Sequence, residues 1–497
     1  MKKLYELAEI CLPHQNIVKA LLEGKQNKYI WALYGLLNSG QILTNTEAMA
    51  LILGKHDVKH FSSIKGKMID AFIKVISIQD VSNVKSDIRY NRVVESIRQN
   101  LAARIVLYRG SRGLSMNLLE SSLSDSTFEY LNYNVLDQIR LLTIHYGTVS
   151  YNKYKLNKYF SLEKEYSLIL QNETKALSYY IELKKAQLHS LAEVGPEVIR
   201  LASKYSIELA KLKVQSRTFN FYKFHVFVKR FEFNRDFHKL LTLCDNAEIE
   251  FSTKELYSVS SITAVRQARL WTLIQLGRYS ECIYKGLPEL SREELAATNW
   301  YSFLHYTLKA YLYSANYEKA EELIAYCINH KNYKRLNVEL KEVADLHLGY
   351  IHLIKGSGLY KTNSPSENVL PNFKVGKYLN NTQVFSKDKR GINVSILLMH
   401  IAFLLQRKDY NAIIDRTDSL NQYAYRYLRK DDSFRSNCMI KMVIQMTKAD
   451  FHPVRTARYT ADLRKQLSHI TLAGSGENIE VEIIPFEVLW DIMTKAL

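Results

Sequence analysis

Asp345, His347 and His352 are the residues whose spacing comes closest to that of a metal site, and they fall in one predicted helix. His347 and His352 are five residues apart, which separates them by about 140° around a helix. Histidines that share a metal on one helix are usually four residues apart. The sequence also has no HExxH, GxSxG or CxxC motif and no glycine-rich phosphate loop. We therefore expect no catalytic residues, no metal and no cofactor, and a protein that is not an enzyme.

The five cysteines are far apart and show no zinc-ligand spacing. Three of them fall at or near the second helix of a predicted hairpin, where a small apolar side chain packs well. We expect buried free thiols and a reducing compartment. The five are Cys11, Cys244, Cys282, Cys327 and Cys438.

Residues 151–160, YNKYKLNKYF, interleave lysines with aromatic side chains. Such a run can stack on bases while its lysines contact phosphates. In the alternative interpretation the rings pack on a neighbouring helix and the lysines stay in water. The formal net charge of +18 and the pI of about 9.3 favour anionic partners without identifying them.

A second basic candidate is the predicted pair of helices in residues 44–76. Thr44 and Glu47 have the spacing of a capping box, and Gly54 ends the short first helix. The pair can be a helix-turn-helix whose second helix faces phosphates. It can equally be an ordinary helical hairpin with a core stripe, Ile64, Met68, Phe72 and Ile76. The lysines that would contact nucleic acid are Lys59, Lys65 and Lys67.

Residues 85–108 predict a further helix, followed by a break at residues 109–113, RGSRG. We expect the apolar side chains of this helix to share one face that packs in the core. They are Val93, Val94, Ile97, Leu101, Ile105 and Leu107. The break predicts a boundary between an N-terminal helical domain, residues 1–108, and a helical array, residues 114–355.

One helical design is repeated within residues 264–330. In each copy a helix ends in a short polar turn and a second helix follows at once, and the turn residues Tyr279 and Tyr317 are 38 residues apart. That period is typical of stacked helical hairpins. Weaker copies of the turn occur at residues 234–237 and 407–412.

These turns resemble the tetratricopeptide repeat (TPR). A small residue, an aromatic two positions later and another small residue three beyond occur twice: Gly277, Tyr279 and Cys282, then Ala315, Tyr317 and Ala320. The first-helix aromatic of the family is missing, since Arg266 and Leu304 stand there. The resemblance implies an all-α, TPR-like α-solenoid of stacked hairpins, with the TPR-like hairpins in residues 234–330.

A solenoid offers an extended surface lined by the first helices of its hairpins. The candidates for partner contact are polar or amphipathic residues at spacings of three or four. They are Arg266, Arg269, Tyr301, His305 and Lys309.

Periodicity fails in residues 356–390, which carry Pro365 and Pro371, and we expect an irregular insertion there. Helical hairpins resume over residues 391–497. Near their end, residues 479–484 alternate apolar and acidic side chains, which predicts a short C-terminal strand that pairs with residues 370–385 or with another chain.

The composition, 47% hydrophobic, excludes a disordered chain. No stretch approaches the ~18 apolar residues that cross a bilayer, and Glu6 and Glu9 interrupt any signal-peptide core, so we expect a cytoplasmic protein. The expected function is a non-enzymatic scaffold, adaptor or sensor that binds a protein or peptide on the solenoid surface. The alternative is a nucleic-acid-binding regulator that uses the basic N-terminal hairpin, with the array as its sensor.

Overall fold

Every regular element in the described part of this computed structural model is a helix, which confirms the all-α class. The structure describes residues 1–11, 15–23, 28–39, 43–78, 88–128, 132–189, 194–253, 256–293, 295–360, 392–427, 435–475 and 481–497. Residues 361–390 of the expected insertion therefore lie outside the part of the chain that the structure describes. No described helix is long and apolar enough to cross a membrane.

The chain divides into two compact units, Met1–Arg98 and Gln99–Leu497. The division falls within α6 (Ile88–Tyr108), before the glycine-containing turn at residues 109–113. Each unit has its own hydrophobic core.

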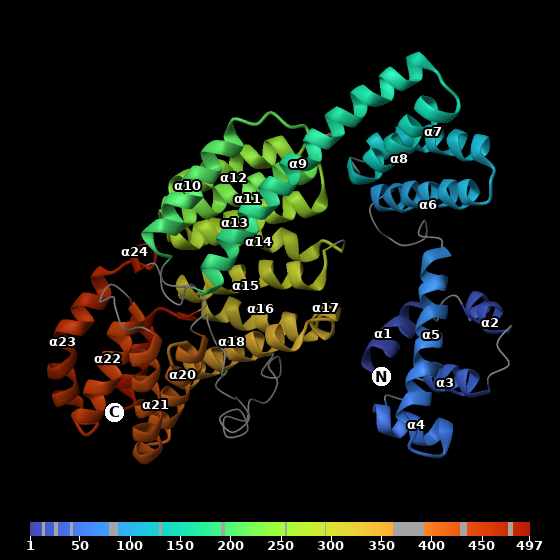
Figure 1. The fold of residues 1–497 in the computed structure, drawn as a ribbon. Coiled ribbons are helices and arrows are strands. Elements are labelled where there is room, and N and C mark those ends of the chain that lie inside the picture. The colour runs from blue at the N-terminus through green and yellow to red at the C-terminus, as the bar shows by residue number, and fades with distance from the viewer. Residues whose placement is uncertain are drawn as a thin grey trace. The chain divides into compact units, whose positions relative to one another are not determined.

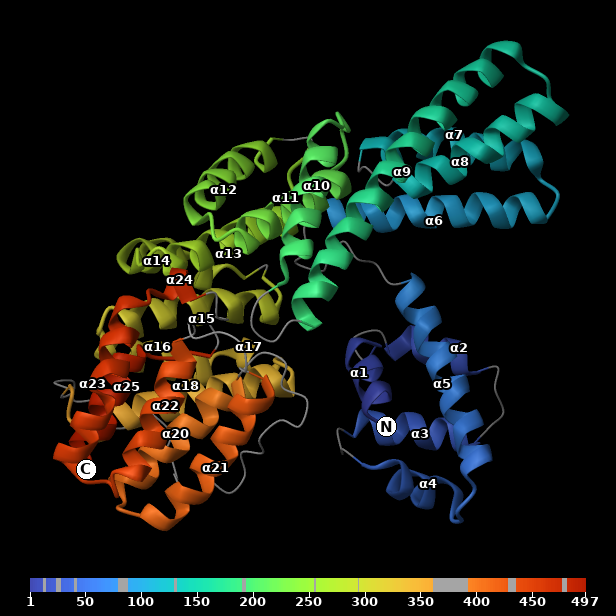
Figure 2. The ribbon, with the colours of Figure 1, turned by 60° about the vertical axis from the view of Figure 1, so that its left-hand side comes forward.

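The first unit is organised around one long helix, α5, which packs against the four helices before it (Figures 1 and 2). Its helices are α1 (Lys2–Cys11), α2 (Gln15–Glu23), α3 (Lys28–Asn38), α4 (Asn45–Leu53) and α5 (Val58–Ile78). The predicted stripe of α5 is buried at Ile64, Met68 and Phe72. The predicted capping box is present, because the Glu47 amide donates to Thr44 Oγ1 over 3.3 Å and the Thr44 amide donates to Glu47 Oε2 over 2.7 Å.

In the second unit most helices pack against the next one along the chain (Figure 1). After α6, the first half of this unit contains the following helices: α7 (Arg112–Phe128), α8 (Asn132–Ile144), the π-helix η2 (His145–Val149), α9 (Lys153–His189), α10 (Pro196–Ala210), α11 (Arg217–Phe233) and α12 (Phe237–Phe251). Next come α13 (Val259–Gln275), α14 (Tyr279–Gly286), the 3-10 helix η3 (Leu287–Ser291), α15 (Ala297–Tyr313), α16 (Tyr317–Asn329), α17 (Lys331–Lys334) and α18 (Val338–Gly356). The last are α20 (Ile392–Gln406), α21 (Tyr410–Tyr427), α22 (Arg435–Lys448), α23 (Pro453–His469), α24 (Leu472–Ser475) and α25 (Phe486–Lys495).

Four turns between helices share one backbone geometry, and they are the four that the sequence singled out. The residue after each first helix's cap has a left-handed backbone, with φ between 55° and 69°, and the next amide donates to the carbonyl five residues earlier over 2.9 to 3.0 Å. This arrangement closes a helix with satisfied carbonyls and redirects the chain. The left-handed residues are Arg235, Gly277, Ala315 and Lys408.

The aromatic residue that follows each of these turns packs against an aromatic residue in or just after a later helix. The ring centroids are 4.5 to 5.8 Å apart, within the range of favourable aromatic contacts. The pairs are Phe237 with Trp271, Tyr279 with Tyr313, Tyr317 with Tyr360, and Tyr410 with Phe451. One contact is thus reused from one helical hairpin to the next.

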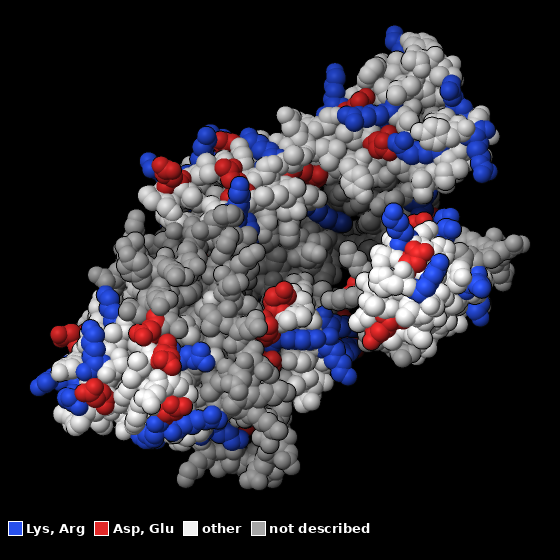
Figure 3. Space-filling model, turned by 60° about the horizontal axis from the view of Figure 1, so that its bottom comes forward, with Lys and Arg blue, Asp and Glu red and all other residues white. Residues whose placement is uncertain are grey.

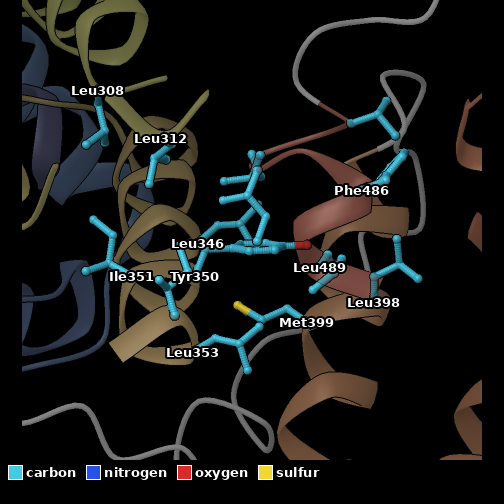
Figure 4. Packing of buried hydrophobic residues seen from close by; sticks show 14 of the residues in the cluster. Leu308, Leu312, Leu346, Tyr350, Ile351, Leu353, Leu398, Met399, Phe486 and Leu489 are labelled. Atoms are coloured by element: carbon cyan, nitrogen blue, oxygen red, sulfur yellow. The ribbon is translucent and has the colours of Figure 1, made fainter. Parts of the chain in front are cut away.

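The largest core cluster extends from α13 to α25. Figure 4 shows Leu346 and Tyr350 of α18 facing Met399 of α20 and Leu489 of α25. The Tyr350 hydroxyl donates to the Ser395 carbonyl over 2.8 Å, so the ring is fixed between these helices. All five cysteines are buried and none forms a disulfide, as the sequence predicts.

The predicted C-terminal strand is not present in the part of residues 479–484 that the structure describes, which begins at Val481. The alternation of apolar and acidic residues predicted that one face would be exposed to solvent, but residues 481–484 are all buried, Glu482 included. Side chains take the place of a strand partner: Lys309 Nζ and the Tyr313 hydroxyl donate to the Glu482 carbonyl over 2.7 and 2.9 Å, and Ser395 Oγ donates to the Val481 carbonyl. The segment is therefore fastened to α15 and α20. Its predicted partner, residues 370–385, lies outside the described residues.

Gly286 lets α14 lie close to α15. A β-carbon at this position would fall 2.2 Å from Oγ1 of the buried Thr307. We expect Gly286→Ala to lower the free energy of unfolding by about 1–3 kcal/mol through overpacking, although alanine favours helix by about 1 kcal/mol. Urea unfolding of Gly286→Ala and of the double variant with Thr307→Ala measures this. The double variant should regain part of the loss, and an unchanged single variant would contradict the close approach.

Candidate functional site

All five predicted partner-contact residues belong to the second unit, and four of them lie in its interior. Arg269, Tyr301, His305 and Lys309 are buried, and Arg266 is half-buried. They contact neighbouring helices of the same chain, so four of them do not line an exposed surface in this structure.

Arg266 and Arg269 join α13 to α12 and η3 through ion pairs. Arg266 Nε is 2.8 Å from Glu248 Oε1 and its Nη1 is 2.7 Å from Glu289 Oε1. Arg269 pairs with Glu248 and is 3.0 Å from Asp245. Burial alone would raise the pKa of Glu248, but hydrogen bonds and charge from the two arginines lower it. The cluster therefore holds α12 and α13 together.

His305 and His347 meet edge to face, with ring centroids 5.0 Å apart. His347 Nδ1 lies 2.7 Å from the Val343 carbonyl, while its Nε2 and both nitrogens of His305 have no hydrogen-bond partner among the described residues. Burial lowers the pKa of His347 to about 4 and that of His305 well below 6.5, so both are neutral at pH 7. Within the described ranges, no three His, Cys, Asp or Glu side chains gather as metal ligands.

The three lysines of the predicted helix-turn-helix lie on α5, with Lys59 and Lys67 exposed. Lys65 is half-buried, and its Nζ donates to Asn45 Oδ1 over 3.0 Å. Lys65 and Lys67 point about 160° apart around the helix. The three lysines therefore do not form one phosphate-binding face.

The basic and aromatic run at residues 151–160 divides into an exposed and a buried part. Tyr151 and Tyr154 are 71% and 80% exposed, whereas Tyr159 is 3% exposed. Lys155 is half-buried, with its Nζ 2.8 Å from Glu120 Oε1. Neither interpretation from the sequence describes the whole run, because Tyr159 packs and the other two tyrosines face solvent.

Glu120 of α7 anchors this run. Its Oε1 accepts hydrogen bonds from the Tyr146 and Tyr159 hydroxyls, each over 2.9 Å, as well as from Lys155. Burial alone would raise the pKa of Glu120, but its three donors lower it. The cluster ties the π-helix η2 and the start of α9 to α7. Short π-helices often mark functional sites.

The apolar face that the sequence predicted for α6 is not its core face. Ile97, Leu101 and Ile105 are 40%, 57% and 48% exposed. The face that packs carries small or polar side chains, among them Ser96, Asn100 and Ala103. Asn100 Nδ2 donates to Asn134 Oδ1 over 2.6 Å. The correction has a physical reason: the Asn100 amide nitrogen has two acceptors in α8, Asn134 and Asp137, so this face packs and the aliphatic residues are left outside.

Sequence reasoning missed the exposed face of α6, because aliphatic spacing at three and four does not tell which face of a helix is covered. The signal present was the series Ser96, Asn100 and Ala103, which also repeats at helical spacing. Neither a motif nor the hydrophobic periodicity marks the π-helix η2 in the sequence.

Comparison of the chain with protein-family models, with curated proteins and with solved structures gives no match.

Proposed function

We propose that this protein is a non-enzymatic binding protein, a TPR-like α-solenoid that acts as a scaffold, adaptor or sensor for a protein partner. The four equivalent turns and their recurring aromatic pairs support the solenoid, because repeated hairpins that reuse one contact stack in a row. Four of the five residues predicted for partner contact, Arg269, Tyr301, His305 and Lys309, are buried among these helices.

The exposed stripe of α6 in the second unit, defined as Leu101 and Ile105, carries the proposal. The two residues are four apart, so they form one ridge along the helix. A ridge of aliphatic side chains in water is the feature that partner proteins bury. The partner that suits it is a protein with an apolar groove or an amphipathic helix, bound by helix packing.

Leu101→Glu with Ile105→Glu tests the stripe. We expect affinity purification from the native cell, read by mass spectrometry, to lose its specific partner about tenfold or more, because burial of each aliphatic side chain contributes on the order of 1 kcal/mol or more. The matched control is Ile249→Glu, which alters a single aliphatic residue that is 73% exposed on α12. A partner retained by the stripe variant and lost by the control would reject the proposed surface.

A further inference from the structure

We propose a second binding surface, beyond the protein-binding function, that takes a single-stranded nucleic acid at the end of the α6 to α9 helices. This basic–aromatic surface consists of Tyr108, Arg109, Arg112, Tyr151, Lys153 and Tyr154.

The α6–α7 turn and the η2–α9 connection lie at one end of these helices. Ser115 Oγ near the start of α7 donates to the Ala103 carbonyl near the end of α6, over 2.7 Å. Lys155 near the start of α9 reaches Glu120 of the same α7. The Tyr146 hydroxyl of η2 also donates to Glu120 over 2.9 Å, and Met116 near the start of α7 belongs to the same core cluster as Tyr146. Tyr108, Arg112 and Tyr154 therefore belong to one end of the bundle.

The rings and charges at this end are open to solvent. Tyr108, Tyr151 and Tyr154 are 85%, 71% and 80% exposed. Arg109, Arg112 and Lys153 are exposed, and none has an acidic partner within the described ranges. The neighbouring cations Arg104 and Lys155 are already neutralised by Asp137 and Glu120. In Figure 3 the upper-right lobe, formed by these helices, carries several lysine and arginine side chains and few acidic ones.

The backbone that presents Tyr151 and Tyr154 is fixed before any ligand binds. Asn152 caps α9, since its Oδ1 accepts from the Lys155 amide over 3.0 Å, and its own amide donates to the Tyr146 carbonyl over 3.2 Å. The Glu120 cluster holds both flanks. A preorganised surface loses less entropy on binding.

Unstacked bases suit this surface better than the other polyanions do. Each exposed ring offers a face to one base while adjacent cations contact the backbone. Duplex bases are already stacked on one another and leave the rings without a partner. An acidic peptide would use Arg109, Arg112 and Lys153 but not the three tyrosines.

The full-length protein should bind fluorescent oligo-dT or oligo-U, measured by anisotropy from low to moderate salt. We expect Tyr151→Ala and Tyr154→Ala each to weaken binding roughly five- to hundredfold, through loss of one stacked base. Replacing Arg109, Arg112 and Lys153 with glutamine should reduce the slope of log affinity against log salt by about 2, at roughly 0.7 per phosphate contact.

The matched control is Tyr284→Ala with Lys285→Gln, an exposed tyrosine and lysine on α14, which should bind as the wild type does. No salt-dependent binding of either oligonucleotide would overturn the proposal. Equal binding by the tyrosine variants and the control, together with competition by polyglutamate, would assign the surface to an acidic peptide instead. Replacing Leu101 and Ile105 with serine, which places no charge one helical turn from Arg109, should keep oligonucleotide binding, and this separates the surface from the protein-binding stripe.

Discussion

Replacing Glu482 with glutamine is expected to lower the free energy of unfolding by up to about 3–5 kcal/mol, because the buried Arg435 loses the less exposed of its two carboxylate partners, Glu482 and Glu487. Arg435 Nε and Nη2 are 2.8 and 2.9 Å from the two carboxylate oxygens of Glu482, and the two side chains are 7% and 2% exposed. Glu482 Oε1 also accepts from the Phe486 amide over 2.8 Å, at the start of α25. Urea unfolding measures the loss, and limited proteolysis of residues 481–497 reports release of the C-terminal segment.

The matched control for Glu482→Gln is Asp491→Asn, which removes the partner of Arg464 in an ion pair more than half exposed on both sides. Exposed pairs contribute less than about 1 kcal/mol. Replacing both Arg435 and Glu482 with aliphatic residues should cost less than the sum of the two single changes, since no charge is left buried. If Glu482→Gln costs no more than Asp491→Asn, the ion pair does not hold the C-terminal segment.

Two buried histidines, His347 and His400, are together expected to contribute about 4 kcal/mol to the stability that the protein loses between pH 7 and pH 5, and the buried His305 adds to that loss. Burial lowers the pKa of His347 and of His400 to about 4, from 6.5 in the unfolded chain. Below pH 6.5 the unfolded chain therefore binds more protons than the folded one, so stability falls with pH until about pH 4 and is fully present above pH 6.5. Each histidine contributes about 2 kcal/mol over this range, at about 1.4 kcal/mol per pH unit.

The hydrogen bond between His347 and the Val343 carbonyl raises the pKa of His347, but the positive charges near both histidines act with burial to lower their pKa values. Lys309 lies near His347, and Arg416 lies near His400; both positive charges oppose protonation. Unfolding curves at pH 7 and pH 5 measure the difference for the wild type and for His347→Leu, which should reduce it by about 2 kcal/mol. His238→Leu is the control, because His238 is exposed and its ring stays in water. An undiminished difference in His347→Leu would show that His347 does not titrate as described.

Local features of the sequence predicted the elements and their turns well. The residues at 234–237, 276–279, 314–317 and 407–410 adopt one geometry because the turn is closed by hydrogen bonds within a few residues. The Thr44 and Glu47 capping box forms for the same reason. Neither depends on distant parts of the chain.

The candidate surfaces depended on distant contacts, and there the sequence misled. The helical spacing of Lys309 predicted a surface residue, yet its side chain is fully buried. Burial is possible because the Glu482 carbonyl, far along the chain, accepts a hydrogen bond from its ammonium group. The sequence of residues 151–160 does not indicate that Tyr151 and Tyr154 face solvent. Glu120 decides that, because it binds Tyr159 and Lys155 and turns the rest of the run outward.

The sequence by itself determined the all-α class, the helical hairpins and the positions of their repeated turns, since these follow from periodicity and hydrogen bonds between near neighbours. Only the tertiary structure decided which helix faces are covered. A polar side chain is buried where a distant group satisfies it, as Asn134 satisfies Asn100, and an aliphatic one is left in water where the packing face is already filled, as on α6.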